Sequence, residues 1–455
     1  MPSAGFDPTK LESLLASEVA AYRDLHPASA ALHAAGEHLF GRVPMTWMNK
    51  WSGGFPLGLA EAHGAQVTDL DGVTYVDLAL GDTGAMAGHS APAVVEAMAR
   101  RVGELGGITA MLPTEDAEWV AAELTSRFGP TQWSFSLSAT DANRWALRLA
   151  RLATGRPKVA VFAYSYHGSV DESFVVLEDG VTVSRPGNVA PAVDPALTSV
   201  AMEFNDLSSV RAALESRDVA VLLMEPAMTN IGIVLPEPGF LDAVAAVCRE
   251  TGTLLAIDET HTISAGPGGM TARDGLEPDL VTLGKAIAGG VPIGAYGLSA
   301  ELADRVRSAL SHGADIVDVG GVGGTLAGNA LSLAAARACL GEVLTPEAFV
   351  GMEALATRFT EQVVSSISRH GLPWSVSQLG ARSEYRFASP APRSGSASAE
   401  AADEDLEAYL HLYLANRGVL LTPFHNMALC CPDTTAEQVD LHGELFDAAL
   451  AALVG

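Results

Sequence analysis

Short apolar runs alternate with segments of helical spacing between residues 133 and 299 of this 455-residue chain. The runs occupy residues 133–137, 159–163, 219–224, 254–257 and 280–283. This alternation is typical of βαβ units, which build a mostly parallel sheet covered by helices. We therefore expect an α/β fold with its central sheet in the middle of the chain.

A distinctive polar residue or turn follows each apolar run. The residues concerned are Ser138, Ala139 and Thr140, then Tyr166 and His167, then Glu225, Asp258 and Lys285. In open α/β sheets, ligands bind outside the carboxyl ends of the strands. The five strand ends therefore predict one shared ligand site, and their coincidence is more specific than any single motif.

Lys285 is one of only four lysines, the others being Lys10, Lys50 and Lys158. It lies between apolar residues, in the sequence TLGKAIA, whereas the other three lie among polar or turn residues. An ammonium group in apolar surroundings loses hydration, which favours the free amine and suits a Schiff base with a carbonyl cofactor. The alternative is a lysine whose stem covers apolar surface while its amine reaches water.

Two other strand ends suggest partners for such a cofactor. The segment from Ser138 to Thr140 precedes a helix that we expect to begin near Asp141, and a helix N-terminus binds phosphate, although a simple helix cap gives the same pattern. Asp258 follows a buried run and needs a charged partner, either a protonated pyridine nitrogen or an arginine. Tyr166 could stack on a planar ring.

These segments resemble the class III aminotransferases, which are pyridoxal-phosphate enzymes of fold type I, and most of all the branch with glutamate-1-semialdehyde aminomutase and β-amino-acid aminotransferases. The similarity runs from about Phe55 to the C-terminus. It is carried by TLGKAIAGGVPIGAYG around the lysine, LLAIDETHT, AYSYHG, MEPAMTNIG and GGTLAGN.

The resemblance implies a large cofactor domain with a mostly parallel sheet at residues 76–330. A smaller α+β domain would come from residues 1–75 and 331–455. Lys285 would hold pyridoxal 5′-phosphate covalently and act as general acid and base, and Asp258 would pair with the ring nitrogen. The implied cofactor contacts also include Ser138, Ala139, Thr140, Tyr166, His167 and Glu225. Thr325 would reach the phosphate of a neighbouring subunit, which implies a homodimer with shared active sites.

The chain departs from the family pattern at three places. Ala139 stands where relatives usually have glycine, which is tolerable if the local φ is negative. Thr260 and His261 follow the Asp-Glu pair, and His261 is either a substrate contact or a structural histidine. Where relatives often carry a substrate-binding arginine, this chain has Phe424 and His425.

A substrate carboxylate therefore needs another arginine. Arg382, Glu384 and Arg386 alternate on an expected strand and would share one face. Arg382 is our candidate for the carboxylate, the alternative being two solvated or salt-bridged arginines. Trp47, Lys50, Trp51, Phe424 and His425 are the other candidate substrate contacts.

The expected activity is transfer of an amino group from an amine or amino acid to a keto acid, ketone or aldehyde. An aminomutase on the same scaffold is the main alternative, followed by a decarboxylase and a non-catalytic cofactor-binding relative. All of these act on or bind small molecules.

Composition limits the other partners. The formal net charge of −27 argues against nucleic acid and anionic membrane surfaces, which need basic patches. The four cysteines show no CxxC spacing, so we predict no metal site and a reducing, cytoplasmic location. No apolar run approaches the ~20 residues of a membrane helix. Residues 389–403 are low in complexity and predict a flexible surface loop.

Overall fold

A computed structural model describes residues 5–310, 315–317 and 319–455. The chain divides into two compact units, each of which is described by itself. The large unit comprises residues 92–346 and 393–400, and the small unit comprises residues 1–91, 347–392 and 401–455. The chain passes from one unit to the other after residue 91 and again after residue 346. The domain limits expected from the sequence, after residues 75 and 330, lie somewhat before these positions.

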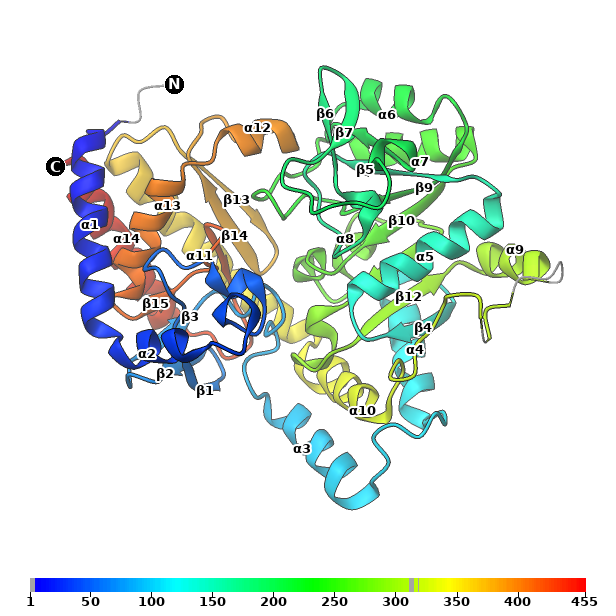
Figure 1. The fold of residues 1–455 in the computed structure, drawn as a ribbon, viewed down its shortest axis with the longest axis horizontal. Helices are drawn as coiled ribbons and strands as arrows, with labels where there is room; N and C mark the ends of the chain where they lie inside the picture. Colours follow the sequence, from blue (N-terminus) through cyan, green and yellow to red (C-terminus); the bar gives the residue numbers. More distant parts are fainter. Residues whose placement is uncertain (1–4, 311–314, 318) are drawn as a thin grey trace. The chain divides into compact units, whose positions relative to one another are not determined.

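A seven-stranded sheet organises the large unit, in the order β4-β12-β11-β10-β9-β5-β8 (Figure 1). Its strands are β4 (Gln132–Ser136), β5 (Lys158–Phe162), β8 (Ser199–Met202), β9 (Val219–Met224), β10 (Leu254–Asp258), β11 (Leu280–Leu283) and β12 (Gly294–Leu298). Only β12 runs against its neighbours. All five apolar runs thus form strands that end at the same edge, which confirms the predicted mostly parallel α/β fold.

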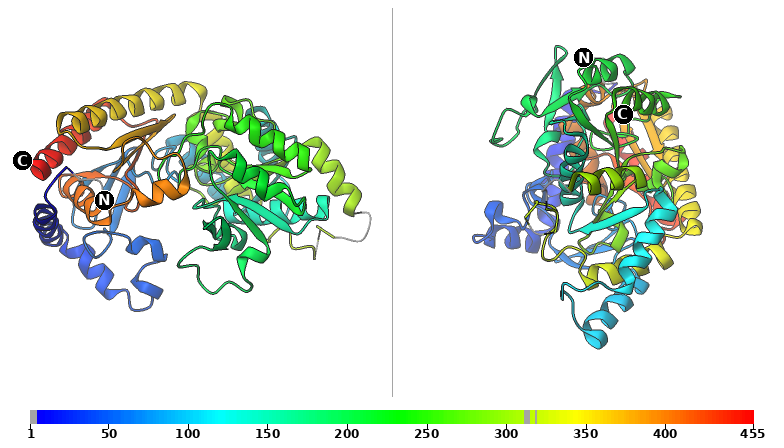
Figure 2. Two further views of the ribbon diagram at one scale, coloured as in Figure 1. Left: turned by 90° about the horizontal axis from the view of Figure 1, so that it is seen from above. Right: turned by 90° about the vertical axis from the view of Figure 1, so that its right-hand side faces the viewer.

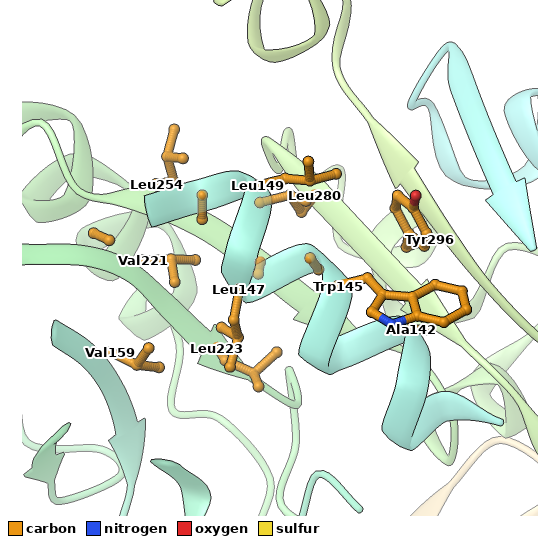
Figure 3. Close-up of a cluster of buried hydrophobic side chains, with 14 of the residues drawn as sticks. Ala142, Trp145, Leu147, Leu149, Val159, Val221, Leu223, Leu254, Leu280 and Tyr296 are labelled. Carbon is orange, nitrogen blue, oxygen red and sulfur yellow. The ribbon is translucent and has the colours of Figure 1, made fainter. Parts of the chain in front are cut away.

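Side chains on both faces of this sheet are buried, as a parallel sheet covered by helices requires. One face packs against α5 (Ala139–Thr154) and α9 (Ala300–Leu310), and Figure 3 shows this cluster, in which Val221 and Leu223 face the helix. On the other face, Phe162 lies 6.0 Å from Phe240 of α7 (Phe240–Thr251), measured between ring centroids. Because alternate residues of a strand point to opposite faces, an inner strand such as β9 is continuously apolar, whereas the edge strand β4 has exposed residues.

The remaining elements of the large unit surround this core. They are α3 (Pro92–Arg100) with its continuation Arg101–Leu105, α4 (Glu115–Phe128), the hairpin β6 (Val175–Glu178) and β7 (Val181–Ser184), α6 (Leu207–Leu214), α8 (Gly269–Arg273), α10 (Ala330–Ala338) and α12 (Gly395–Glu400). The alanine-rich α10 packs against α3 and α4.

The prediction of a flexible loop over residues 389–403 is wrong in part, because α12 lies within it and belongs to the large unit. Ser396 donates to Glu203 at 2.6 Å, and Ser398 donates to the carbonyl oxygen of Ile231. A Cβ on Gly395 would lie 2.3 Å from the carbonyl oxygen of Ala163. Small residues, which gave the segment its low complexity, are what allow this close docking.

The small unit contains two sheets. The first has the order β1-β2-β3-β15, and the second has the order β13-β14-β16. The strands are β1 (Leu59–His63), β2 (Gln66–Asp69), β3 (Thr74–Asp77), β13 (Ser375–Leu379), β14 (Arg382–Arg386), β15 (Val419–Leu420) and β16 (Met427–Leu429). A hairpin turn at Asp71 and Gly72 joins β2 to β3, and Gly72 takes the positive φ of 82° that such turns need.

Helices complete the small unit. They are α1 (Pro8–Leu25), α2 (Pro27–Ala35), α11 (Pro346–Arg369), α13 (Glu404–Ala415) and α14 (Ala436–Val454). Helix α11, coloured gold in Figure 2, lies along the β13-β14-β16 sheet, and Thr360 and Ser383 join their hydroxyl groups at 2.7 Å. Within the described residues, no helix is long and apolar enough to cross a membrane.

Candidate active site

Lys285 begins a short helical turn, Lys285–Ala288, directly after Gly284 at the end of β11. Its φ is 49°, in the left-handed region that non-glycine residues rarely adopt. The three residues that follow it are fully buried. Strained backbone of this kind persists where the surrounding structure holds it, and it is concentrated at functional sites. The backbone turn that carries the lysine is therefore packed among buried apolar residues, while the lysine itself is half-buried.

Gly284 lets this turn approach the N-terminus of α5. A Cβ at Gly284 would lie 2.8 Å from Cβ of Ala139 and 2.9 Å from its nitrogen. Ala139 is the first residue of α5, and its φ is not positive, so its methyl group meets the condition set from the sequence. The lysine turn and the helix N-terminus are thus neighbours within the large unit.

The N-terminus of α5 is capped by Ser138, whose hydroxyl oxygen accepts from the backbone nitrogen of Asp141 at 3.3 Å. Thr140 accepts from the backbone nitrogen of Ser169 at 3.2 Å. Gly168, with φ of 80°, passes so close that a Cβ would lie 2.0 Å from the Thr140 hydroxyl oxygen. This helix has sixteen residues, so its N-terminus carries the partial positive charge that suits a phosphate.

Asp258 ends β10 and is buried, with 3% of its surface exposed. One carboxylate oxygen accepts from His167 Nδ1 and from Asn143 Nδ2, both at 2.9 Å, and the other accepts from the Thr260 backbone nitrogen at 3.0 Å. Burial by itself raises the pKa of this carboxyl group. The hydrogen bond and charge of His167, with the bonds from Thr260 and Asn143, outweigh burial and lower the pKa to about 2. Asp258 is therefore a fixed negative charge at neutral pH.

Asn143 was not predicted from the sequence. It is fully buried on the inner face of α5, donates to Asp258 and to the carbonyl oxygen of His167, and accepts from the Thr282 hydroxyl at 2.6 Å. It thereby links α5 to both β10 and β11. The available signal was a polar residue among the apolar positions of an amphipathic helix.

Glu225 directly follows β9 and is also buried. Its carboxyl group accepts from the Thr229 hydroxyl at 2.5 Å. Burial raises the pKa of Glu225 to about 7, and the charge of Asp258 acts in the same direction, against His167 and Thr229. The two carboxyl groups therefore differ in protonation near neutral pH, as is common in active sites.

Three further residues from the sequence analysis lie in the large unit. Tyr166 is half-buried, with its ring centroid 6.3 Å from that of Phe174 in an edge-on arrangement. Thr325 is exposed. Nε2 of His261 lies 2.6 Å from Nζ of Lys285, so this histidine contacts the lysine directly.

The candidate substrate residues all belong to the small unit. The Trp47 and Phe424 rings lie 6.2 Å apart, and Nζ of Lys50 is 5.4 Å from the centre of the Phe424 ring. Trp51 is half-buried against a different cluster, around Tyr75 and Leu420. The structure therefore brings Trp47, Lys50 and Phe424 together and places Trp51 elsewhere.

Arg382 lies on the second sheet of the small unit, and His425 lies beside that sheet. Arg382 is fully buried and donates to the Thr83 hydroxyl. Nδ1 of His425 lies 3.6 Å from a carboxylate oxygen of Glu384. The guanidinium of Arg386 lies 3.7 Å from a carboxylate oxygen of Glu407.

The groups of the large unit fit pyridoxal phosphate. A helix N-terminus suits its phosphate, the ionised Asp258 suits a protonated ring nitrogen, and the amine of Lys285 suits its carbonyl carbon. No group of three or more His, Cys, Asp or Glu side chains among the described residues is arranged to hold a metal ion.

Comparisons with known proteins identify the family of this chain. The family model for class-III aminotransferases matches residues 47–448. A glutamate-1-semialdehyde-aminomutase from Pseudomonas aeruginosa PAO1 is 48% identical, with a TM-score of 0.95 over 99% of this chain and 100% of that one. An omega-transaminase from Sphaerobacter thermophilus is 28% identical, with a TM-score of 0.83 over 94% and 98% of the two chains. A beta-phenylalanine aminotransferase from Variovorax paradoxus is 27% identical, with a TM-score of 0.83 over 96% and 97%. The chain belongs to the class-III aminotransferases.

Proposed function

We propose that Lys285 is the residue that binds pyridoxal 5′-phosphate covalently and moves the proton in an amino-transfer reaction. The supporting observation is that Lys285, the ionised Asp258 and the N-terminus of α5 meet at one edge of a single sheet. A variant of the Pseudomonas aeruginosa protein has been crystallised with PMP, the aminated form of this cofactor.

The bound cofactor supplies a carbonyl carbon that exchanges one amine for another and a protonated ring that withdraws electrons. Asp258 keeps the ring nitrogen protonated, and His167 and Asn143 hold Asp258 in place. Ser138, Ala139 and Thr140 orient the phosphate through the helix N-terminus. Tyr166 and Glu225 complete the proposed cofactor contacts.

The proton step belongs to Lys285. With the cofactor bound, the ε-amino group of Lys285 would act as general base and general acid, taking a proton from the substrate Cα and giving it back. With water, the outcome would be a ketone, keto acid or aldehyde from the donor, and a second carbonyl substrate would be aminated in the reverse direction.

For the substrate, we keep the small-unit residues as candidates. Arg382 would bind a carboxylate, and Trp47, Lys50, Phe424 and His425 would contact the rest of the molecule, with Trp51 a further candidate. The pairing of Lys50 with the Phe424 ring supports a mixed apolar and cationic surface.

We further propose a cytoplasmic homodimer. Five large apolar side chains between residues 102 and 112 are each more than two-fifths exposed, and they are Val102, Leu105, Ile108, Met111 and Leu112. Such a concentration of exposed apolar surface marks an interaction site, and a second copy of this chain would cover it. Thr325 is exposed, which suits a residue that reaches the phosphate of the partner.

An aminomutase is the second candidate, because the similarity to glutamate-1-semialdehyde-aminomutase extends over 99% of the chain. A single half-reaction separates the two. Incubated with one amino donor and no acceptor, a transferase releases a stoichiometric carbonyl product and stops with aminated cofactor. A mutase returns an isomer of the donor instead. The assay should cover α-amino acids, β-amino acids and simple amines.

A further inference from the structure

The side chains of Lys285 and His261 meet at the end of the central sheet. The distance from Nζ of Lys285 to Nε2 of His261 is 2.6 Å. His261 is 9% exposed and comes from the segment after β10, while Lys285 comes from the segment after β11. The proposed catalytic amine is thus in hydrogen-bond contact with a buried imidazole.

The strands β10 and β11 bring the two turns together. In the parallel register, Ala256 lies opposite Leu280 and Asp258 lies opposite Thr282. His261 and Lys285 each lie three residues beyond this last register pair, in the turns that follow the two strands.

The segment that carries His261 is firmly anchored. The backbone nitrogen of Glu259 donates to the carbonyl oxygen of Thr282 at 2.9 Å. The Glu259 carboxylate accepts from the hydroxyl groups of Thr262 at 2.5 Å and Thr271 at 2.6 Å. The histidine is therefore held in a fixed position against the lysine turn.

A nitrogen–nitrogen contact of this length requires one donor and one acceptor. Either an N–H of Lys285 donates to an unprotonated Nε2, or an N–H at Nε2 of the imidazole donates to the free amine. Two positive charges at this distance would repel each other, so the hydrogen bond needs at least one neutral partner.

We propose that His261 is a positioning residue for Lys285, an inference that rests on the proposed role of the lysine. When the ε-amino group is a free neutral amine, it donates an N–H to Nε2 of a neutral His261. After Lys285 takes a proton from the substrate, the ammonium keeps this hydrogen bond to the neutral imidazole. The proton then leaves Lys285 for its acceptor without passing to His261, so the amine is restored and no other reagent is consumed.

Other titratable groups at this edge of the sheet are Asp258, His167, Glu225 and Glu259. Asp258 is bound by His167, Glu225 is bound by Thr229, and Glu259 is bound by threonines. Their charges bear on the pair, but each is the same in a His261 variant, so a comparison of variants isolates the imidazole.

The first experiment uses the cofactor-free protein and does not depend on turnover. The rate at which a small acylating reagent modifies Lys285 is measured by peptide mass spectrometry across pH 5–11 for wild type, His261→Gln and His261→Asn. Wild type should show two ionisations, which belong to the coupled pair. Both variants should show one, because an amide accepts the hydrogen bond without titrating. The exposed His63→Gln serves as the control and should match wild type.

The second experiment uses the loaded enzyme. His261→Ala should lower kcat by about 10²-fold, the lower end of what a positioned proton-transfer group contributes, with KM almost unchanged. His261→Gln should recover part of that loss by holding the amine. Equal acylation profiles in wild type and both amide variants, or unchanged kcat in His261→Ala, would overturn the proposal.

Borohydride reduction of the loaded proteins separates the two levels of inference. If wild type carries no label on Lys285, the proposed function itself fails. If Lys285 is labelled in wild type and in His261→Ala while the acylation profiles agree, only the role of His261 is lost.

Discussion

Asp258 in the large unit and Glu384 in the small unit are both buried carboxylates, yet their surroundings differ. Asp258 accepts three hydrogen bonds, from His167, Asn143 and the Thr260 backbone. Among the described residues, neither carboxylate oxygen of Glu384 has a hydrogen-bond partner, and its nearest ion-pair contact is His425 at 3.6 Å. A full set of donors marks a charge that the fold maintains, whereas an under-bonded carboxylate leaves the small unit with a desolvation cost.

Replacing the well-bonded carboxylate should have the largest effect. Asp258→Asn removes the negative charge that would keep the pyridine nitrogen of the cofactor protonated, while the shape of the side chain stays almost the same. The amino-transfer half-reaction should slow by several orders of magnitude, at about 1.36 kcal/mol per decade. Single-turnover absorbance measurements check this, and near-normal turnover would reduce Asp258 to a structural role.

Arg382 tests the function assigned to the second sheet of the small unit. Arg382→Ala removes a buried charged hydrogen-bond donor. Loss of such a donor to a bound carboxylate costs about 2–5 kcal/mol of binding free energy. KM for amino and keto acids should therefore rise strongly, while simple amines are almost unaffected.

Arg386→Ala is the matched control, since this arginine lies on the same strand but faces Glu407. It should affect both donor types alike. Equal losses for acids and simple amines in Arg382→Ala would place the carboxylate site elsewhere.

Glu225 extends the comparison of buried carboxyl groups to the pH dependence of stability. Its pKa rises from 4.5 to about 7 on burial, so its contribution to stability is full below pH 4.5 and is lost as pH rises through about 7. The side chain of Glu225→Gln does not titrate. Its free energy of unfolding should therefore rise by up to about 3 kcal/mol relative to that of wild type between pH 4 and pH 8. Thermal melting midpoints across that range check it.

Asp258 should stabilise the protein in the opposite pH range. Because its pKa is lowered to about 2, its contribution to stability is lost only as pH falls below 4. A Glu225→Gln melting curve that stays parallel to wild type at every pH would contradict the assignment of a raised pKa. Glu250→Gln, at an exposed ion pair with Arg211, provides the control with no such trend.

The smallest effect is expected at Glu384 itself. Glu384→Gln removes the desolvation cost of the carboxylate but buries an amide that is also short of partners, so the two effects offset each other and the free energy of unfolding should change by no more than about 1 kcal/mol in either direction. Denaturant unfolding followed by fluorescence measures it. A loss of several kcal/mol would show that the carboxylate is as well supported as Asp258.

The same contrast explains what the sequence could and could not predict. The strand ends of the large unit were predictable because apolar runs are local signals and each ends in a recognisable polar residue, such as Asp258 or Lys285. Asn143 was missed, since its partners on β10 and β11 lie more than a hundred residues away. Residues 395–400 were taken for a loop because glycine and serine resemble linker composition, although in the structure they fit against the backbone at Ala163 and Ile231.

The candidate substrate residues were the hardest to predict, since Trp47, Arg382 and Phe424 come from three separate segments of the small unit. The local sequence around these residues did not indicate that Trp47 would contact Phe424 or that Trp51 would pack near Tyr75. The departures from the family pattern proved more informative. Ala139 is accommodated in a helical position, and His261 contacts the lysine.

The most direct test of the account is to locate the lysine that binds the cofactor. The protein is loaded with pyridoxal 5′-phosphate, reduced with borohydride, digested and mapped by mass spectrometry, with Lys285→Ala as the control. We predict one pyridoxyl group on Lys285 in wild type and none in the variant. A label on Lys50 or Lys158, or no label at all, would contradict the proposed active site.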